Sequence, residues 1–482
     1  MRTRISLMIL GVAALLLCAC GGGGSAFGDG GGVDGSSDGG GAYDGTNPNF
    51  NTDGAVGDGG CVNLQCQQSC ASTQISGYVY DPKGTVPLYN VFVYVPNAPL
   101  DPITSGPVCT ACQAPASGSP LVSATTDETG HFVLPNVPDG ANIPLVLQLG
   151  KWRRVLTLPN VQKCVDNRYN TKASPKDTSV ESFMRLPKKQ GETSPNDNIP
   201  LIAVTTGMCD YGECFLLSTI GIDIKEFNTG GRVQIYDGSG GETAYPHSYG
   251  NALSNLWNNA SNMNKYDIIF ASCECSTEDR GSGYANIQNY LNGGGRFFGT
   301  HYHYNFFANQ TQCANSYPDA TCKGPSDFNG VAQWMGDGAA TYSGTPFYID
   351  MTFPKGKSMA QWLNNIAGGT LGQISLYETR NDVNMLTTGK ATRWIYSDSP
   401  GGNASNAYSA LYLSFNTPVN NQPANQCGRA VFSDVHVAGT SSGFCQNMDS
   451  SYQSNLNALE FLFFDLSSCV QDDTKPPVQP PN

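Results

Sequence analysis

The sequence has few charged side chains. They make up 13% of its 482 residues, and acidic residues outnumber basic ones by 39 to 26. The formal net charge of −13 argues against a nucleic acid or an anionic membrane surface as partner. Histidine is also scarce, with five residues. Beyond the amino terminus no stretch approaches the ~18 consecutive apolar residues of a membrane-spanning helix. Polarity comes mainly from Gly, Asn, Ser and Thr, which suits an extracellular surface and identifies no ligand.

The amino terminus, MRTRISLMILGVAALLLCACGGGG, carries two arginines before an apolar segment too short to span a bilayer. Its last residues resemble a bacterial lipobox, because the small residue Ala19 precedes Cys20. The resemblance implies a signal peptide over residues 1–20 and a lipid anchor on Cys20. Such an anchor carries more than one acyl chain and therefore holds the protein firmly on the membrane. The residue after Cys20 is Gly21 rather than an aspartate. In similar Gram-negative lipoproteins this implies sorting to the outer membrane. A plain secretory signal is the alternative.

Cysteine usage agrees with export. Of 17 cysteines, Cys18 would leave with the signal and Cys20 would carry lipid, so 17 − 2 = 15 remain. This density predicts disulfides, and the odd number leaves at least one thiol unpaired.

Residues 21–60 are Gly/Ser/Asp-rich and predict a flexible tether that lifts the folded part off the membrane.

Residues 61–186 predict an all-β sandwich. Segments such as ISGYVY, VFVYV, HFVLPNV and PLVLQL alternate or run apolar for a few residues between turn signals such as DPKG and DETG. The stretch from residue 74 to about 165 resembles the transthyretin-like "carboxypeptidase regulatory" domains in its turn glycines. The resemblance implies a noncatalytic accessory module.

Two clusters in this region have alternative interpretations. Cys109 and Cys112 (CTAC), with Cys164 and the cysteines at 61, 66 and 70, are expected to join the sandwich by disulfides, and a zinc site in CTAC is the alternative. The GKWRR cluster, residues 150–154, predicts a solvated strand edge, with a binding role as the alternative.

After a polar linker at residues 187–198, the pattern changes. Residues 199–470 alternate buried strands with helical segments, which predicts a doubly wound, flavodoxin-like α/β sheet. Residues 471–482 are proline-rich and predict a disordered tail. The expected strands include IPLIAVTTG, GRVQIYDG, KYDIIFAS, RFFGTH, GQISLY, ATRWIYSD, ALYLSF and GRAVFSDVHV, and the expected helices ECFLLSTIGI, NALSNLWNNASNM, YANIQNYLN, MAQWLNNIAG and QSNLNALEFLFFDL.

Within this region, YDIIFAS, NGGGRFFGTH and GRAVFSDVHV resemble the class I glutamine amidotransferase-like fold, and its trehalose-utilisation (ThuA-like) branch most. In the catalytic members a cysteine stands where this chain has His301, and their histidine corresponds to His436. The glutamate two positions further is absent, since Ala438 and Gly439 cannot replace it. Without a positioned thiol and this glutamate, glutamine amidotransferase activity is not expected.

Ligands of such sheets bind beyond the carboxyl ends of the strands, where we expect His301 and His436 to meet. Three interpretations of this edge are open: a zinc or other divalent metal site, an aromatic pocket floor without metal, and a sugar pocket. A catalytic thiol from Cys273 or Cys275 is a further alternative to oxidised or buried cysteines. The candidate metal ligands are His301, His303 and His436. The candidate ligand-binding residues are His301, Tyr302, His303, Tyr304, His436, Asp434 and Glu274, with Asn305, Phe306 and Phe307 in the sugar pocket.

The sequence thus predicts a lipid-anchored envelope protein whose amidotransferase-like region binds a glycan or similar ligand, without catalysis. A metal-assisted hydrolase acting on carbohydrate or envelope material is the second hypothesis, with His301, His303 and His436 as ligands. A purely structural envelope protein is the third.

Overall fold

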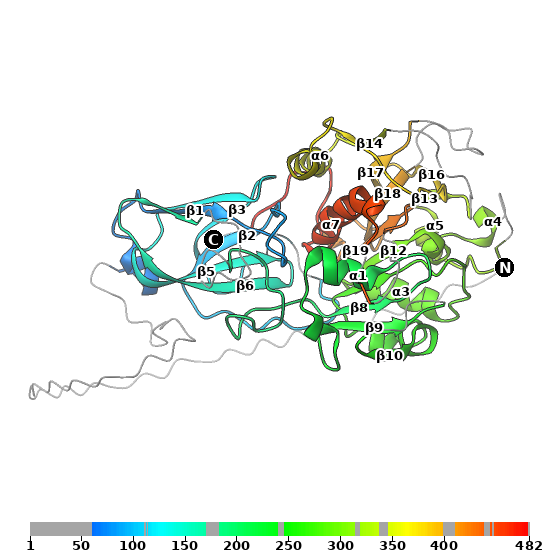
Figure 1. Ribbon diagram of the computed structural model, residues 1–482, viewed down its shortest axis with the longest axis horizontal. Coiled ribbons are helices and arrows are strands. Elements are labelled where there is room, and N and C mark those ends of the chain that lie inside the picture. The colour runs from blue at the N-terminus through cyan, green and yellow to red at the C-terminus, as the bar shows by residue number, and fades with distance from the viewer. Residues whose placement is uncertain are drawn as a thin grey trace, which may run out of the picture. The chain divides into compact units, whose positions relative to one another are not determined.

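The computed structural model describes residues 60–109, 112, 114–169, 183–239, 245–313, 319–336, 346–398, 410–437, 444–445 and 448–480 (Figure 1). The predictions for the signal peptide with Cys20, for the tether up to residue 59, and for Ala438 and Gly439 concern residues outside these ranges. Within the described ranges, no helix combines the length and apolarity needed to cross a membrane.

The described residues between 61 and 186 form two small sheets, ordered β4-β1-β7 and β3-β2-β5-β6. The strands are β1 (Gln74–Tyr78), β2 (Phe92–Pro96), β3 (Pro120–Thr125), β4 (His131–Pro135), β5 (Gly140–Leu149), β6 (Trp152–Val161) and β7 (Asp166–Tyr169).

Alternating burial explains how these sheets pack. In β4, Phe132 and Leu134 are buried whereas Val133 is 40% exposed. The two buried side chains share one core cluster with Val93 of β2 and Leu145 of β5, so both sheets bury an apolar face in the same core. Short strands are what the sequence predicted; the predicted alternation is present in β4, whereas β2 is buried along its whole length.

The remaining chain builds a ten-stranded sheet, ordered β10-β9-β8-β11-β12-β19-β18-β17-β14-β15, and a two-stranded sheet of β13 and β16. Their strands are β8 (Ile202–Thr205), β9 (Val233–Asp237), β10 (Ser248–Asn251), β11 (Ile268–Ala271), β12 (Arg296–Thr300), β13 (Ala332–Trp334), β14 (Phe347–Ile349), β15 (Gln373–Ile374), β16 (Val383–Leu386), β17 (Thr392–Tyr396), β18 (Ala410–Thr417) and β19 (Gly428–Ser433).

This sheet is parallel only in part. Strands β10, β9, β8, β11, β12 and β19 are parallel neighbours, whereas β18, β17, β14 and β15 continue the sheet antiparallel. A mixed α/β fold is therefore confirmed, but a doubly wound sheet describes only the parallel part. The connection from β18 to β19 is too short for the crossover that parallel strands need, so these two strands pair as neighbours in opposite directions.

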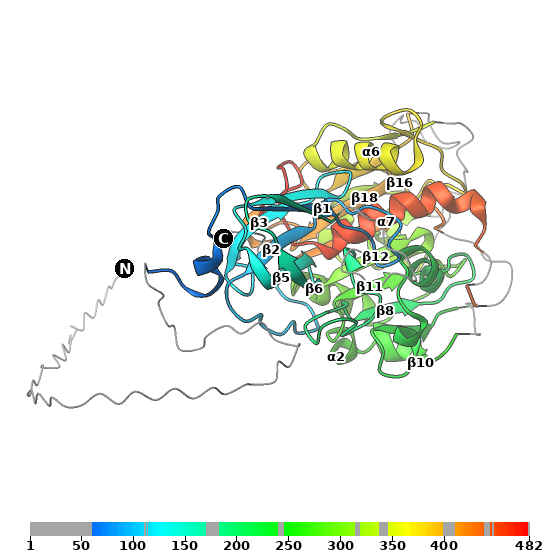
Figure 2. The same ribbon diagram turned by 60° about the vertical axis from the view of Figure 1, so that its left-hand side comes forward.

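Helices cover both faces of the parallel part (Figures 1 and 2). Along β11, Ile268 shares a core cluster with Phe463 of α7, while the next residue, Ile269, shares another with Ile287 of α3. Because side chains alternate across a strand, α7 and α3 lie on opposite faces. The helices are α1 (Gly212–Cys214), α2 (Ala260–Met263), α3 (Gly283–Asn292), α4 (Gln310–Cys313), α5 (Ser326–Asn329), α6 (Pro354–Ala367) and α7 (Gln453–Ser467).

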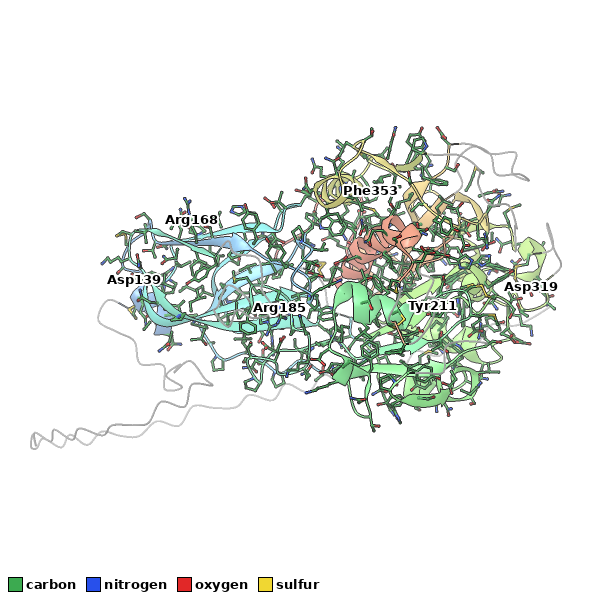
Figure 3. The ribbon with its side chains drawn as sticks, viewed as in Figure 1. Asp139, Arg168, Arg185, Tyr211, Asp319 and Phe353 are labelled. Carbon is green, nitrogen blue, oxygen red and sulfur yellow. A yellow bond between two sulfur atoms is a disulfide. The ribbon has the colours of Figure 1, made fainter. Side chains whose placement is uncertain are left out.

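The predicted linker at 187–198 is packed against β6. The buried Arg154 guanidinium lies 2.6 Å from Glu192 and 3.0 Å from Asp197, and Glu192 also pairs with Arg185 at 2.7 Å. Arg185 appears among the side chains of Figure 3. The expectation of a solvated strand edge is therefore wrong for Arg154, because the linker's carboxylates neutralise its charge inside the protein.

The predicted tail is also anchored. Asp473 is buried, and its carboxylate accepts two hydrogen bonds from Arg429, at 3.1 Å and 2.9 Å. A proline-rich composition does not keep residues 471–480 apart from the fold, because this buried ion pair attaches them to β19.

Fourteen of the fifteen described cysteines form disulfides, and Cys273 is unpaired. Cysteine pairing with one free thiol is as predicted. The CTAC prediction needs correction, since Cys109 and Cys112 reach across to the α/β region rather than joining the sandwich strands, and neither is a free zinc ligand. The pairs are Cys61–Cys66, Cys70–Cys164, Cys109–Cys427, Cys112–Cys469, Cys209–Cys275, Cys214–Cys445 and Cys313–Cys322.

Candidate functional site

The parallel strands β11, β12 and β19 end at one edge of the sheet, as the sequence predicted. Thr300 at the end of β12 is in register with Ser433 at the end of β19. His301 follows the first of these strands and His436 the second, and their ring centroids are 5.1 Å apart. Two residues 135 positions apart meet here only because of this topology.

His301 occupies a strained position between two other polar side chains. Its φ of 38° lies in the left-handed region that non-glycine residues rarely adopt. Its Nδ1 lies 3.4 Å from Sγ of Cys273, and its Nε2 lies 3.7 Å from Oδ2 of Asp382. All three side chains are buried. The geometry is that of a thiol, an imidazole and a carboxylate in series.

Asp210, in the loop after β8, holds the cluster together. Its Oδ1 accepts hydrogen bonds from Nδ1 of His436 and from the backbone nitrogen of Val437, both at 3.0 Å. Its Oδ2 accepts one from the hydroxyl of Thr300 and one from the backbone nitrogen of Cys273, the latter at 3.3 Å. Asp210 thereby ties together the ends of three strands. It also keeps the Nδ1 hydrogen on His436, which leaves Nε2 as an acceptor.

Sequence reasoning did not single out Asp210. The signal that could have found it is its place in the loop that directly follows the buried strand IAVTT, at the edge where the histidines were expected. Gly207 permits this loop, because a Cβ there would fall onto the carbonyl oxygen of Cys273.

The electrostatics of the cluster favour neutral groups. Burial, and then the nearby Asp210, raise the pKa of the Cys273 thiol well above its usual value. Burial, followed by His436 and Arg380, lowers the pKa of His301 well below its usual value. Both shifts disfavour the thiolate–imidazolium pair that a cysteine nucleophile requires. The cluster therefore holds a neutral thiol beside a neutral imidazole.

His303 does not join this cluster. It lies in the 3-10 turn His301–Phe306, where its Nδ1 is 3.1 Å from the carbonyl oxygen of Thr300 and its ring stacks on Phe306 at 5.9 Å. Burial is the main cause that lowers its pKa to about 3. His303 therefore does not belong with His301 and His436, and the prediction of these three residues as one metal-binding set needs this correction.

The aromatic residues of the predicted sugar pocket are mostly core residues. Phe306 packs on Trp257 at 5.0 Å, and Phe307 stacks on Trp334 at 5.3 Å. Tyr302, by contrast, is only half-buried, and its ring lies 4.0 Å from that of His301. Of these aromatic side chains only Tyr302 can still face a ligand.

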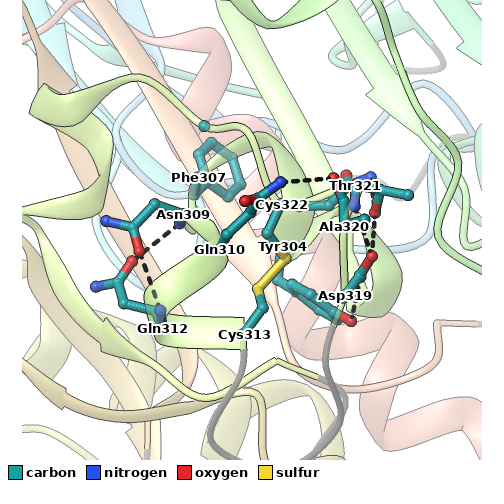
Figure 4. The surroundings of a disulfide bond; sticks show 12 residues. Tyr304, Phe307, Asn309, Gln310, Gln312, Cys313, Asp319, Ala320, Thr321 and Cys322 are labelled. Atoms are coloured by element: carbon teal, nitrogen blue, oxygen red, sulfur yellow. Dashed lines mark hydrogen bonds between the residues drawn. A yellow bond between two sulfur atoms is a disulfide. The ribbon is translucent and has the colours of Figure 1, made fainter.

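Tyr304 is fixed by the segment that follows it. Its hydroxyl donates to Asp319 at 3.1 Å, beside the disulfide between Cys313 and Cys322 (Figure 4). Tyr304 therefore has a structural role in the chain after the turn.

The two predicted acids differ in their surroundings. Glu274 is engaged by the guanidinium of Arg280, with contacts of 2.8 Å and 3.3 Å. Asp434 directly follows β19, and its Oδ2 accepts a 2.6 Å hydrogen bond from the backbone nitrogen of Asp382. Burial raises the pKa of Asp434 to about 7, although hydrogen bonds from Asp382 lower it in part. Asp434 is thus joined to the His301 cluster through Asp382, whereas Glu274 forms a separate ion pair.

Two buried polar atoms around this edge have no hydrogen-bond partner among the described residues: Oδ1 of Asp434 and Oδ1 of Asn381. Buried polar groups without partners are uncommon in folded proteins, because each costs about 1–3 kcal/mol of desolvation. Such atoms at a strand-end edge mark a place where a ligand can contribute the missing partners.

The cluster also contains donors for a metal ion. Three possible ligand atoms, one from each of Cys209, Cys273 and His436, lie within 4.8 Å of one another. Cys209 is oxidised in a disulfide, which leaves Cys273 and His436 from this set, with His301 beside Cys273. The carboxylate of Asp210 behind His436 is the support that metal-bound imidazoles usually have. Sulfur and nitrogen donors of this kind suit zinc.

Comparison with known proteins gives only distant likenesses. No family model and no curated protein matches the chain. Similar solved structures include a ThuA-like protein from Bacteroides uniformis, at 9% identity over 54% of this chain and 90% of that chain, with a TM-score of 0.30. A cytoplasmic protein from Salmonella typhimurium matches at 9% identity over 57% of this chain and 100% of that chain, with a TM-score of 0.29. A cold-adapted beta-galactosidase from Rahnella sp. R3 matches at 12% identity over 60% of this chain and 34% of that chain, with a TM-score of 0.27. None of these scores reaches 0.5, so the similarities assign neither a family nor an activity.

Proposed function

We propose that this chain is an exported, lipid-anchored protein of the outer membrane that binds a glycan or a similar polyhydroxylated molecule without transforming it. In this proposal the ligand lies at the carboxyl edge of the parallel strands, beside His301 and Tyr302, in a ThuA-like, amidotransferase-like α/β region. The amino-terminal strands serve as a transthyretin-like accessory module.

The unpartnered polar atoms at this edge are the observation that carries the proposal. Asp434 and Asn381 each present a buried acceptor oxygen. A sugar offers many hydroxyl groups that donate and accept, together with an apolar ring face. The half-buried ring of Tyr302 supplies the flat surface on which such a face can pack.

Binding without chemistry is favoured by the state of the cysteine. Cys273 is fully buried and His301 is 2% exposed, so neither residue offers an open reacting surface in the described part of the chain. Attack on a carbonyl needs an exposed thiolate, and this environment favours the opposite.

Replacement of Tyr302 or Asn381 by alanine is expected to weaken sugar binding. Titration calorimetry of the purified chain with glucose, trehalose and N-acetylglucosamine should detect binding of at least one of them. Loss of one stacking or hydrogen-bonding contact should lower that affinity about tenfold or more, because ~1.4 kcal/mol corresponds to a factor of ten.

Tyr348→Ala is the matched control, since Tyr348 is a half-buried tyrosine on β14, on the antiparallel side of the same sheet. It should leave sugar affinity unchanged. If none of the sugars binds, or if the control loses as much affinity as Tyr302→Ala, the binding proposal is wrong and a purely structural envelope role is favoured.

The anchor has its own test. Because Cys20 alone follows a small residue in the lipobox-like segment, Cys20→Ser should move the protein from the membrane fraction to the soluble fraction. Cys18→Ser, whose preceding residue is Leu17, is the control and should remain membrane-bound. Retention of Cys20→Ser on membranes after a high-salt wash would contradict the lipid anchor.

A metal-assisted hydrolase is the second candidate, favoured by the sulfur and nitrogen donors of Cys273, His301 and His436 with Asp210 behind one imidazole. A bound metal would supply Lewis-acid chemistry, and Asp210 would orient His436 toward it.

This candidate predicts about one equivalent of zinc in protein purified without chelator, measured by elemental analysis, and a large loss of zinc in Cys273→Ser. Lys323→Gln, at an exposed cation, is the control and should retain the metal. Metal-free protein that takes up no zinc on titration would exclude this candidate and leave the binding proposal standing.

A further inference from the structure

A cleft of about 370 Å³ lies between the amino-terminal strands and the α/β region, at the opposite edge of the parallel strands from the histidine cluster. One wall includes Phe92 of β2 and Leu149 of β5, and the other includes Ile268 at the start of β11 and Arg296 at the start of β12. Its volume is within the range of small-molecule pockets, about 300–1,000 Å³.

The two walls are joined covalently. Cys112 and Cys469 both line the cleft and form a disulfide, and a second disulfide connects Cys109 to Cys427. The walls therefore cannot move far apart, and the cleft exists before any ligand arrives. A preformed site loses less conformational entropy on binding.

Most of the lining is apolar. Phe92, Leu149 and Ile268 are buried core residues, whereas Val108 and Val478, which also line the cleft, are 42% and 38% exposed. Exposed large apolar side chains that gather at a concave surface indicate a surface that a partner covers.

The charged groups in the cleft do not balance. Lys151 is neutralised by Asp267, with Nζ and Oδ1 2.5 Å apart. Arg296 has no carboxylate within 4.0 Å among the described residues: its terminal nitrogens donate only to backbone carbonyl oxygens, and its Nε has no partner. Burial lowers the pKa of Arg296 to about 10, so the guanidinium is still protonated at neutral pH. Asp465 and Asp267 act on this charge from a greater distance, so the guanidinium of Arg296 has no carboxylate in direct contact with it among the described residues.

We infer that this cleft binds a monoanionic amphiphile, an unbranched apolar chain with one carboxylate, whose head group pairs with Arg296 and whose chain packs on Phe92, Leu149 and Ile268. The occupant follows from charge complementarity, since a neutral apolar molecule would leave Arg296 unpaired and a cationic one would be repelled. This site is separate from the carboxyl-edge site and does not depend on the function proposed for it.

The test uses the whole chain carrying Cys20→Ser, purified without detergent, and three probes with the same ten-carbon chain: decanoate, decan-1-ol and decyltrimethylammonium, each below its micelle concentration. Calorimetry should show one decanoate per chain. Decan-1-ol should bind at least about tenfold more weakly, because a charge-assisted hydrogen bond is worth about 1.5–3 kcal/mol. Decyltrimethylammonium should not bind measurably.

Arg296→Gln should reduce the affinity for decanoate to that for decan-1-ol, while Lys323→Gln, at an exposed cation elsewhere, should change neither. Ala116→Phe, which adds volume beside the cleft, should weaken both ligands. If Arg296→Gln does not fold, the probe series on the chain with native Arg296 decides the question. Equal affinity for decanoate and decan-1-ol, or no binding of either, overturns the inference.

Discussion

Replacement of Asp473 by asparagine is expected to lower the free energy of unfolding by about 3–5 kcal/mol, the usual cost of removing one partner from a buried ion pair. Arg429 is 1% exposed, and the carboxylate of Asp473 accepts a hydrogen bond from each of its two terminal nitrogens. Thr392 donates to the same carboxylate at 2.9 Å, and Lys355 lies 3.5 Å from it. Without this carboxylate, Asp465 is the one anionic partner that the buried guanidinium keeps among the residues that the structure describes.

Urea denaturation at pH 7 under non-oxidising, non-reducing conditions measures this loss. Asp472→Asn is the matched control, since the half-buried Asp472 accepts hydrogen bonds only from the neighbouring Thr474. It should cost less than about 1 kcal/mol, as for ordinary surface substitutions. Equal losses in the two variants would show that the ion pair does not anchor the carboxyl terminus.

The effect should also depend on pH in a defined direction. Burial alone would raise the pKa of Asp473, but Arg429 and Lys355 lower it to about 2. A carboxylate with a depressed pKa stabilises the fold fully above its unfolded value, near 3.9, and this contribution is lost as the pH falls through about 2. The unfolding curves of the native chain and of Asp473→Asn should therefore converge as the pH approaches 2.

Much of the fold could be predicted from periodicity, because the burial of regular elements leaves a regular pattern. The apolar runs in KYDIIFAS and RFFGTH correspond to β11 and β12, and the helical spacing in QSNLNALEFLFFDL corresponds to α7. Pairing direction could not be predicted in the same way. Strand ALYLSF is as apolar as the parallel strands of the sheet, but the short connection after it decides that β18 runs antiparallel to β19.

Polar segments were the main source of error. Residues 187–198 and 471–482 have the composition of solvated chain, yet Asp197 and Asp473 are buried beside Arg154 and Arg429. A single sequence does not show which charges will be paired, since the partners come from distant strands. The disulfides of CTAC illustrate the same limit, because cysteine spacing identifies oxidation but not partners.

The candidate site was predicted in outline. Strand ends bring His301 and His436 together, and that follows from topology once the strands are known. The orientation of side chains in the turn after β12 does not follow from topology: the sequence predicts His303 and Phe306 in the site, but both side chains pack inward. Periodicity does not single out Asp210, because it lies in a loop, although its carboxylate contacts Thr300, Cys273 and His436.

Asp210→Ala is therefore expected to have the largest effect on the carboxyl edge. The variant would remove the acceptor of four hydrogen bonds, from Thr300, Cys273, His436 and Val437. The hydroxyl of Thr300 would keep only its 3.4 Å contact with the carbonyl oxygen of Ala271, and the other three buried donors would lose this partner. Each hydrogen bond to a charged group contributes about 1.5–3 kcal/mol, so a loss of at least about 3 kcal/mol in the free energy of unfolding is expected even if water replaces some of them. Binding of any sugar at this edge should be abolished, since His436 would lose its fixed orientation.

Asp279→Ala separates this effect from the loss of a carboxylate in general. Asp279 is an exposed acid paired with Lys323 at 2.5 Å, and exposed pairs contribute about 0.2–1 kcal/mol. Urea denaturation should show a large loss for Asp210→Ala and a small one for Asp279→Ala. If the two losses are similar, Asp210 does not organise the strand ends. If Asp210→Ala is strongly destabilised but the residual folded protein still binds sugar normally, the cluster is structural and the ligand site lies elsewhere.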